Sequence, residues 1–250
     1  MLAILGAFED GPATLTLTEI AAAAQLPMPT AHRLAAELVE WGALRKDAGG
    51  RYRVGRRIWK IGQNAGRELR DSARRHLSDL FTLTGETCQL AIRDGEQALV
   101  IERIYGSAEA LRSTKAGDRL PLHSTAVGLV LLAYEPPWLR EAYLARPGLP
   151  LDPQDRRRLA EELTAVRERG HAVCAPEAPA GCSIAVPVLV DPDHAVAAIG
   201  LVTPAAVQQH RARHVAALNQ AAHRMEPEAR RWPNTRAIVA AFQPPEARPG

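Results

Sequence analysis

Basic side chains are concentrated between Pro29 and Lys60, in a pattern that suits contact with a polyanion. This segment holds eight cations and three acids, a net charge of +5, whereas the whole chain carries +3. Arginine and lysine neutralise phosphates, and an arginine guanidinium can also donate two hydrogen bonds to a guanine edge. A charge run alone is more often a solvated surface, so the assignment to nucleic acid depends on the elements that hold these side chains.

Two helices are predicted at the start of this segment. Thr16 and Glu19 have the spacing of a capping box, in which the side chain of each residue bonds a backbone N–H of the other. The helix that they start ends at 25–28, and Pro29 suits the first position of the next helix, where no N–H is needed. Apolar residues at spacings of three and four predict one buried stripe on this second helix: Ala31, Leu34, Leu38 and Trp41.

The opposite side of the second helix carries the residues that could read DNA. At about 100° per residue, the residues that face outward are Pro29, His32, Arg33, Ala36 and Glu40, with Thr30 at the border. His32 and Arg33 can reach base edges, and Thr30 suits a phosphate oxygen or a base. Gly42 is expected to end the helix.

A basic hairpin completes the module. Strands are predicted at 43–46 and 51–54, joined by a turn at 47–50. Helix, turn, helix and wing in this order predict a winged helix-turn-helix, whose second helix enters the DNA major groove. The predicted DNA-binding residues are Pro29, Thr30, His32, Arg33, Arg45, Lys46, Arg51 and Arg53.

Composition narrows the class of protein. A chain of 250 residues with 46% hydrophobic and 24% charged residues is typical of a globular protein with room for two modest domains. Aromatic residues make up 4%, which argues against a platform that stacks single-stranded bases. Cys88, Cys174 and Cys182 show no framework spacing and are expected to be reduced thiols. Residues 1–8 are predicted to form a core helix that packs Leu2 and Phe8 rather than a signal peptide, and no apolar run could span a membrane, so a cytoplasmic protein is expected.

The rest of the chain predicts an α+β fold. A linker helix over 56–72 follows the winged helix-turn-helix domain at 1–55, and a GAF-like sensory domain at 73–230 precedes a disordered tail at 231–250. In the sensory domain, helices are expected at 73–83, 124–133, 137–145, 153–169 and 204–230, strands at 88–92, 98–104, 111–115, 171–174, 183–190 and 195–203, and a loop at 117–122. The Asp94-Gly95 dipeptide predicts a hairpin turn. These elements are expected to form an antiparallel sheet with helices packed on it.

The order of these motifs resembles the IclR family of bacterial transcription regulators, nearly to residue 226. In the N-terminal part the resemblance is carried by LTEIAAAAQLPMPTAHRL and GRYRVGRRIWKIG. In the sensory part it is carried by TGETCQLAIRDG, AGDRLPLHSTAVGLVLLA, ERGHAV and the pair SIAVPV…AAIGLVTP. The resemblance implies a homodimer or homotetramer that binds double-stranded DNA at a palindromic operator, and a C-terminal domain that binds a small organic effector, often a carboxylate.

The resemblance also implies an effector site, formed by Thr125, Ala126, Val127, Cys174, Ser183, Gly200 and Val202. Relatives that bind small keto-acids tend to have an acidic residue in place of Cys174, a cysteine in place of Ser183, and serines in place of Gly200 and Val202. Hydroxyl donors for a carboxylate are therefore few, and an unpaired charge in an apolar pocket costs several kcal/mol. An apolar or aromatic acid is predicted in place of glyoxylate or pyruvate.

Other kinds of protein fit less well. His171, Cys174 and Cys182 could make a metal- or thiol-responsive regulator, although their spacing is no established zinc pattern. An enzyme could use Cys174 with His171, but residues three apart on a strand point to opposite faces. The chain has no phosphate loop, nucleophile elbow or dinucleotide fingerprint. We therefore predict no enzyme activity, no cofactor and no metal; a plain interaction module without a ligand stays open.

Overall fold

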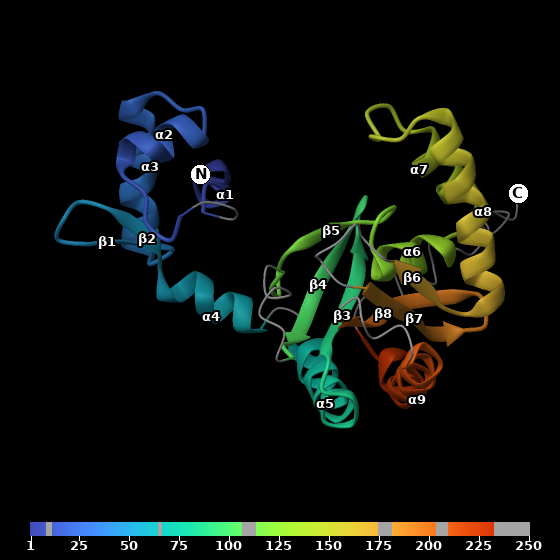
Figure 1. Cartoon of the computed structure of the whole chain (residues 1–250). Coiled ribbons are helices and arrows are strands. Elements are labelled where there is room, and N and C mark those ends of the chain that lie inside the picture. The colour runs from blue at the N-terminus through green and yellow to red at the C-terminus, as the bar shows by residue number, and fades with distance from the viewer. Residues whose placement is uncertain (9–11, 65–66, 107–113, 175–181, 204–209, 233–250) are drawn as a thin grey trace, which may run out of the picture. The chain divides into compact units, whose positions relative to one another are not determined.

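The computed structural model describes residues 1–8, 12–64, 67–106, 114–174, 182–203 and 210–232 (Figure 1). The chain divides into two compact units, Met1–Arg67 and Glu68–Gly250. The described residues form one hydrophobic core in the first unit and two in the second. Within the described residues, no helix is long and apolar enough to cross a membrane.

The N-terminal unit is a winged helix-turn-helix, as predicted. Glu19 N–H donates to Thr16 Oγ1 at 3.2 Å and Thr16 N–H donates to Glu19 Oε2 at 2.6 Å, which confirms the capping box. Leu15 exchanges backbone hydrogen bonds of 2.9 and 2.7 Å with Tyr52 and so ties the wing to the helices. The elements are α1 (Leu2–Gly6), α2 (Leu17–Ala23), α3 (Met28–Trp41), β1 (Leu44–Lys46), β2 (Tyr52–Val54) and α4 (Arg56–Asn64).

Three details of this unit differ from the prediction. The buried stripe of α3 consists of Ala31, Ala35 and Leu38, whereas Trp41 is 45% exposed. Trp41 lies in the last turn before Gly42, which ends the helix in the left-handed conformation at φ 82°, and the Arg57 guanidinium covers its ring at 4.2 Å. Pro29 occupies the second helical position because Pro27 is the N-cap residue. In α1, Ile4 is fully buried whereas Leu2 is 82% exposed, so the expected packing of Leu2 is wrong.

As far as its residues are described, the C-terminal unit is built on a six-stranded antiparallel sheet with the order β5-β4-β3-β8-β7-β6. The strands are β3 (Thr87–Asp94), β4 (Gln97–Ile104), β5 (Arg119–Pro121), β6 (Ala172–Cys174), β7 (Cys182–Asp191) and β8 (His194–Thr203). The helices are α5 (Arg67–Thr84), α6 (Ala126–Ala133), α7 (Pro137–Ala145), α8 (Pro153–Arg169) and α9 (Arg211–Ala229). This confirms the predicted antiparallel sheet with helices packed on it.

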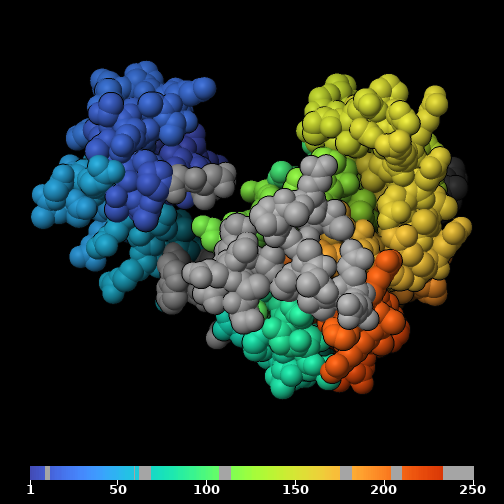
Figure 2. Space-filling view, in the orientation of Figure 1, coloured from blue at the N-terminus to red at the C-terminus, as the bar shows by residue number. Residues whose placement is uncertain are grey.

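The two faces of the sheet carry different side chains because residues alternate along each strand. One face packs larger side chains, such as Leu90, Ile199 and Leu201, against α5 and α9. The other face carries alanines where α6 approaches, and α8 packs outside α6. In the space-filling view the surface of α7 and α8 (yellow) lies on the opposite side of this unit from α5 (teal) and α9 (orange to red) (Figure 2).

Helix α6 is held close to the sheet and to the segment that precedes it. All eight of its residues are buried, which explains its lack of a polar side. A Cβ on Gly128 would lie 2.6 Å from the Cα of Leu122 and 2.6 Å from the carbonyl oxygen of Pro121. Only glycine fits at this position, because both neighbours are backbone atoms. The start of α6 is therefore fixed against the sheet.

Several predicted boundaries of the C-terminal unit change. The predicted loop at 117–122 contains β5, which pairs with the edge of β4, and Pro121 is tolerated there because no further described strand needs its N–H. Helix α5 runs without a break from Arg67 to Thr84, across the predicted boundary at 72–73 between the linker helix and the first helix of the sensory domain. Of the strand predicted at 111–115, residues 111–113 lie outside the described residues and 114–115 are not in a strand. Residues 204–209 and 233–250 also lie outside the described residues, and the tail predicted at 231–250 starts too early because Trp232 is buried in the hydrophobic core.

Candidate nucleic-acid interface and effector site

The outward side of α3 carries the polar residues that the sequence predicts. Pro29, His32 and Arg33 are exposed, and Thr30 is half-buried at the edge. The Arg33 guanidinium lies 2.6 Å from Glu37 one turn along the helix, and the two side chains are 66% and 41% exposed. An exposed pair at this spacing contributes only about 0.3 kcal/mol, so Arg33 can exchange this partner for a base or phosphate.

The wing presents two arginines directly opposite each other. Arg45 of β1 pairs in register with Arg53 of β2, and both side chains are exposed. Leu44 is buried in the core, so its neighbour Arg45 points away from the core. Like charges at opposed positions destabilise a hairpin, and a polyanion would relieve this repulsion. Lys46 is also exposed, and its ammonium group lies 5.2 Å from the centre of the Tyr52 ring.

Arg51 is placed differently from the other cations of the wing. Its guanidinium donates to Thr14 Oγ1 at 3.1 Å and to the Thr14 carbonyl at 3.0 Å, and it lies 3.4 Å from Glu19 Oε2. The pKa of Glu19 is lowered, first by its hydrogen bonds from Thr16 and to a smaller extent by Arg51. Arg51 therefore joins the wing to the start of α2, and its predicted phosphate contact stays a prediction.

The structure brings the predicted effector residues together below the start of α6. Cys174, Ser183 and Val202 are paired neighbours on β6, β7 and β8 and so share one face of the sheet. Gly200 lies two residues before Val202 on the same face, where a Cβ would be 3.1 Å from Val127 Cγ1. Ala126 is buried beside Val127 in the first turn of α6.

The polar atoms of these residues are already engaged. Thr125 is the N-cap residue of α6: its hydroxyl accepts from Gly128 N–H at 3.2 Å and donates to the Pro121 carbonyl at 2.8 Å. The Cys174 thiol donates to the Ser124 carbonyl at 3.1 Å, and the Ser183 hydroxyl donates to the Cys174 carbonyl at 3.5 Å. Burial raises the pKa of the Cys174 thiol, which keeps it neutral. The effector residues predicted from the sequence therefore include no charged side chain that could bind a carboxylate.

A buried cation on the same face was missed by the sequence analysis. Gln89 of β3 pairs with Gly200 on one side and with Arg103 of β4 on the other, which puts all three on the face that α6 covers. Gln89 and Arg103 are 3% and 8% exposed, and the Arg103 guanidinium donates to the Gln89 side-chain oxygen. Burial lowers the pKa of Arg103. The sequence signal was an arginine and a glutamine inside two apolar strands.

The predicted alternative site of His171, Cys174 and Cys182 is not assembled. Cys182 precedes Ser183 on β7 and packs in the core below α9, whereas Cys174 lies on the face below α6. Burial raises the pKa of both thiols. His171 Nδ1 lies 3.0 Å from the carbonyl oxygen of Arg169. In the part of the chain that the structure describes, no three His, Cys, Asp or Glu residues are grouped to hold a metal ion.

Comparison with known proteins adds the family. The model of the IclR helix-turn-helix domain matches residues 1–48, and the model of the bacterial transcriptional regulator IclR C-terminal domain matches residues 64–226. The chain is 32% identical over 210 residues to the HTH-type transcriptional regulator XynR of Escherichia coli, covering 81% of this chain and 83% of that one. It is 30% identical over 200 residues to the transcriptional repressor YiaJ of the same organism, covering 75% and 70%.

Comparison with solved structures leads to the same family. An IclR homolog from Microbacterium hydrocarbonoxydans in complex with 4-hydroxybenzoate matches with a TM-score of 0.82 at 28% identity, over 92% of this chain and 97% of that one. IclR of Thermotoga maritima matches with a TM-score of 0.71 at 25% identity, over 91% and 96%. On this evidence the chain belongs to the IclR family, and its two units carry the helix-turn-helix and the effector-binding domain of a bacterial transcription regulator.

Proposed function

We propose that this protein acts in the cytoplasm as a homodimer or homotetramer that binds a palindromic operator. Binding of an organic acid lowers or raises its affinity for this operator. The exposed placement of His32 and Arg33 on α3 carries the DNA-binding part of the proposal. Two such helices would read half-sites about one DNA turn apart, or a multiple of this. Its relatives are named as transcriptional regulators, and the same role is proposed here in place of an enzyme activity.

The effector would act by shifting a population. An acid bound below α6 changes operator affinity only if it binds better to one arrangement of the paired DNA-binding units than to the other. Helices α4 and α5, which follow each other between the wing and the sheet, are the chain segment through which this preference would pass. A coupling of about 1–3 kcal/mol, or 5- to 150-fold in affinity, is typical of such systems.

We propose an aromatic carboxylic acid as the effector. The predicted site is lined by small and apolar residues: Gly200 and Ala185 are paired neighbours packed close to Val127, and Val202 lies on the same face. Arg103, held by Gln89, adds the positive charge that the predicted residues do not provide. A related structure was solved with 4-hydroxybenzoate, a molecule of this class.

The proposal is tested by fluorescence anisotropy with a labelled duplex from the region upstream of the gene and a scrambled duplex of equal length. The upstream duplex is expected to bind at least tenfold more tightly at physiological salt. Aromatic acids, with 4-hydroxybenzoate as the first probe, are expected to change the affinity for the upstream duplex and leave the scrambled duplex unaffected. Equal affinity for both duplexes would contradict the DNA-binding part, and no response to any acid would contradict the effector part.

A substitution of Arg103 tests more directly whether the effector is bound through its carboxylate. Replacing Arg103 with methionine keeps much of the side-chain volume but removes a charged hydrogen-bond donor worth about 1.5–3 kcal/mol. Affinity for the acid is expected to fall by about 10- to 150-fold in calorimetric titration. The uncharged amide of the same acid serves as the control and should bind the variant and the wild type alike. Equal losses for acid and amide would show that Arg103 only supports the fold.

A further inference from the structure

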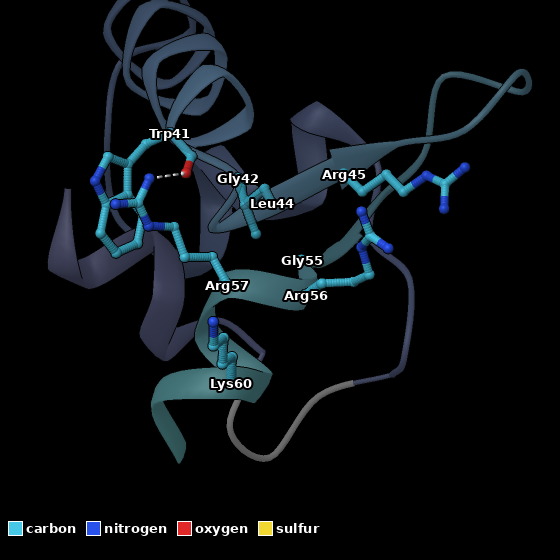
Figure 3. Close-up of a pocket in the computed structure, with 8 residues that line it drawn as sticks. All are labelled: Trp41, Gly42, Leu44, Arg45, Gly55, Arg56, Arg57 and Lys60. Atoms are coloured by element: carbon cyan, nitrogen blue, oxygen red, sulfur yellow. Dashed lines mark hydrogen bonds between the residues drawn. The ribbon is translucent and has the colours of Figure 1, made fainter. Parts of the chain in front are cut away.

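A pocket in the N-terminal unit lies where the end of the predicted reading helix, the wing and α4 meet. It encloses about 1130 Å³ between the end of α3, β1 and the first turns of α4 (Figure 3). Its lining combines one aromatic ring, a buried leucine, two glycines and four cations: Trp41, Gly42, Leu44, Arg45, Gly55, Arg56, Arg57 and Lys60. All of these residues belong to the same compact unit.

The shape of this pocket is fixed by close backbone packing. A Cβ on Gly55 would lie 2.2 Å from the Gly42 carbonyl oxygen, so only glycine lets the chain leave β2 beside the end of α3. Gly55 N–H donates to the Ala43 carbonyl at 2.7 Å, and Arg57 N–H donates to the Gly42 carbonyl at 3.3 Å. The backbone of the first turn of α4 is thus attached to the end of α3. This fixes the positions from which the side chains of Arg56 and Arg57 extend.

One wall of the pocket is preorganised. The Arg57 guanidinium stacks on the Trp41 ring with 4.2 Å between its carbon and the ring centre, and it donates to the Trp41 carbonyl at 3.2 Å (Figure 3). These two contacts restrict the rotamers of both side chains, so less entropy is lost when a ligand binds against them. Trp41 remains 45% exposed.

The remaining three cations of the pocket have no counter-charge among the described residues. Within the residues that the structure describes, Arg45, Arg56 and Lys60 have no acidic partner within ion-pair distance, and all three are exposed. The first turn of α4 contains no acidic residue either. Arg45 belongs both to this pocket and to the wing, which makes the pocket continuous with the cations expected on phosphates.

We propose that this pocket, which we call the α4 pocket, binds phosphate groups of the DNA backbone beyond those that α3 and the wing contact. The proposal rests on the DNA-binding function proposed above. Charge complementarity and continuity with the wing favour a duplex as the partner. The pocket is also far larger than one phosphate ion, whereas a sugar-phosphate strand carries successive charges along a groove.

The test replaces Arg56 and Lys60 with glutamine in the full-length protein. Each cation that neutralises a phosphate contributes about 0.9 to the slope of log affinity against log salt. The double variant is therefore expected to lower this slope by about 1–2 and to weaken binding roughly tenfold at physiological salt, equally for upstream and scrambled duplexes. The matched control replaces Arg157 and Arg158, two exposed cations of α8, with glutamine and should leave the slope unchanged.

Phosphate ethylation interference then locates the contact. Wild-type protein should show phosphates whose ethylation blocks binding and which no longer matter in the R56Q/K60Q variant. An unchanged salt slope in this variant, beside a wild type that binds the duplex normally, would overturn the assignment of the α4 pocket alone. A variant that loses stabilisation by inorganic phosphate in thermal unfolding while keeping the wild-type slope would also overturn it, in favour of a small anion. A wild type that binds no duplex would contradict the proposed function itself.

Discussion

Replacing Arg33 with alanine is expected to weaken operator binding by about 1–3 kcal/mol and to relax the base preference at one position of each half-site. The side chain is 66% exposed on the outward side of α3, and its contact with Glu37 is an exposed helical pair. A bidentate contact with a guanine is worth far more than this pair, so the loss should appear in binding and hardly in stability. Anisotropy with a set of single-base operator variants measures both effects.

Arg158 provides a matched control for this prediction. It is an exposed helical arginine in the C-terminal unit, with its side chain 69% exposed and an acidic neighbour, Asp155, at 3.6 Å. Arg158→Ala removes the same charge from the same kind of environment and should change neither affinity nor base preference. If Arg158→Ala and Arg33→Ala weakened binding equally, the loss would reflect net charge, and α3 would not be the reading helix.

Replacing Gly128 with alanine is expected to destabilise the C-terminal unit by about 3 kcal/mol. The added Cβ would lie 2.6–2.7 Å from three backbone atoms of Pro121 and Leu122, none of which can move without displacing β5 or α6. Overpacking of this kind typically costs 1–3 kcal/mol when side chains can adjust, and backbone contacts put this position at the upper end. The change in the free energy of unfolding is measured by urea unfolding that is monitored through amide hydrogen exchange, which reports on the two units separately.

Gly6→Ala is the comparison for this substitution. Gly6 lies in α1, where a Cβ would meet nothing within 4 Å, so alanine there should be neutral or stabilising through its better helix propensity. Effector binding should also weaken in Gly128→Ala, because Ala126 and Val127 precede the substituted position in the same helix. Wild-type stability of Gly128→Ala would contradict the close packing of α6 on its preceding segment.

Helices and turns were predicted well where a local sequence signal determines where they begin or end. Helices α7 and α8 have the predicted bounds because each begins at a proline, and α8 also ends at Gly170, which adopts a left-handed φ of 74°. The turn at Gly95 and the capping box at Thr16 are local in the same sense. In each case a short-range backbone preference determines where the element begins or ends.

Predictions failed where contacts between segments far apart in the sequence determine the local structure. Strand β5 forms because β4 offers an edge, which no pattern within 117–122 reveals. Trp41 has the spacing of a core residue, but a stacked arginine from α4 covers it in place of the core. Arg103 was missed for the same reason: its place on the same face as Gly200, with Gln89 between them, depends on a strand register that joins β3, β4 and β8 across about a hundred residues of sequence. The effector residues taken from the family resemblance, by contrast, are brought together below α6.

Dimethyl sulfate protection of guanine N7 tests the central claim most directly, because this atom is accessible only in the major groove. Wild-type protein bound to its upstream duplex is predicted to protect a guanine N7 in each half-site. Arg33→Ala, at a concentration that still saturates the duplex, should lose that protection while Arg158→Ala keeps it. Identical protection by the wild type and Arg33→Ala, or no protected guanine in the major groove, would contradict the assignment of α3 as the helix that reads DNA.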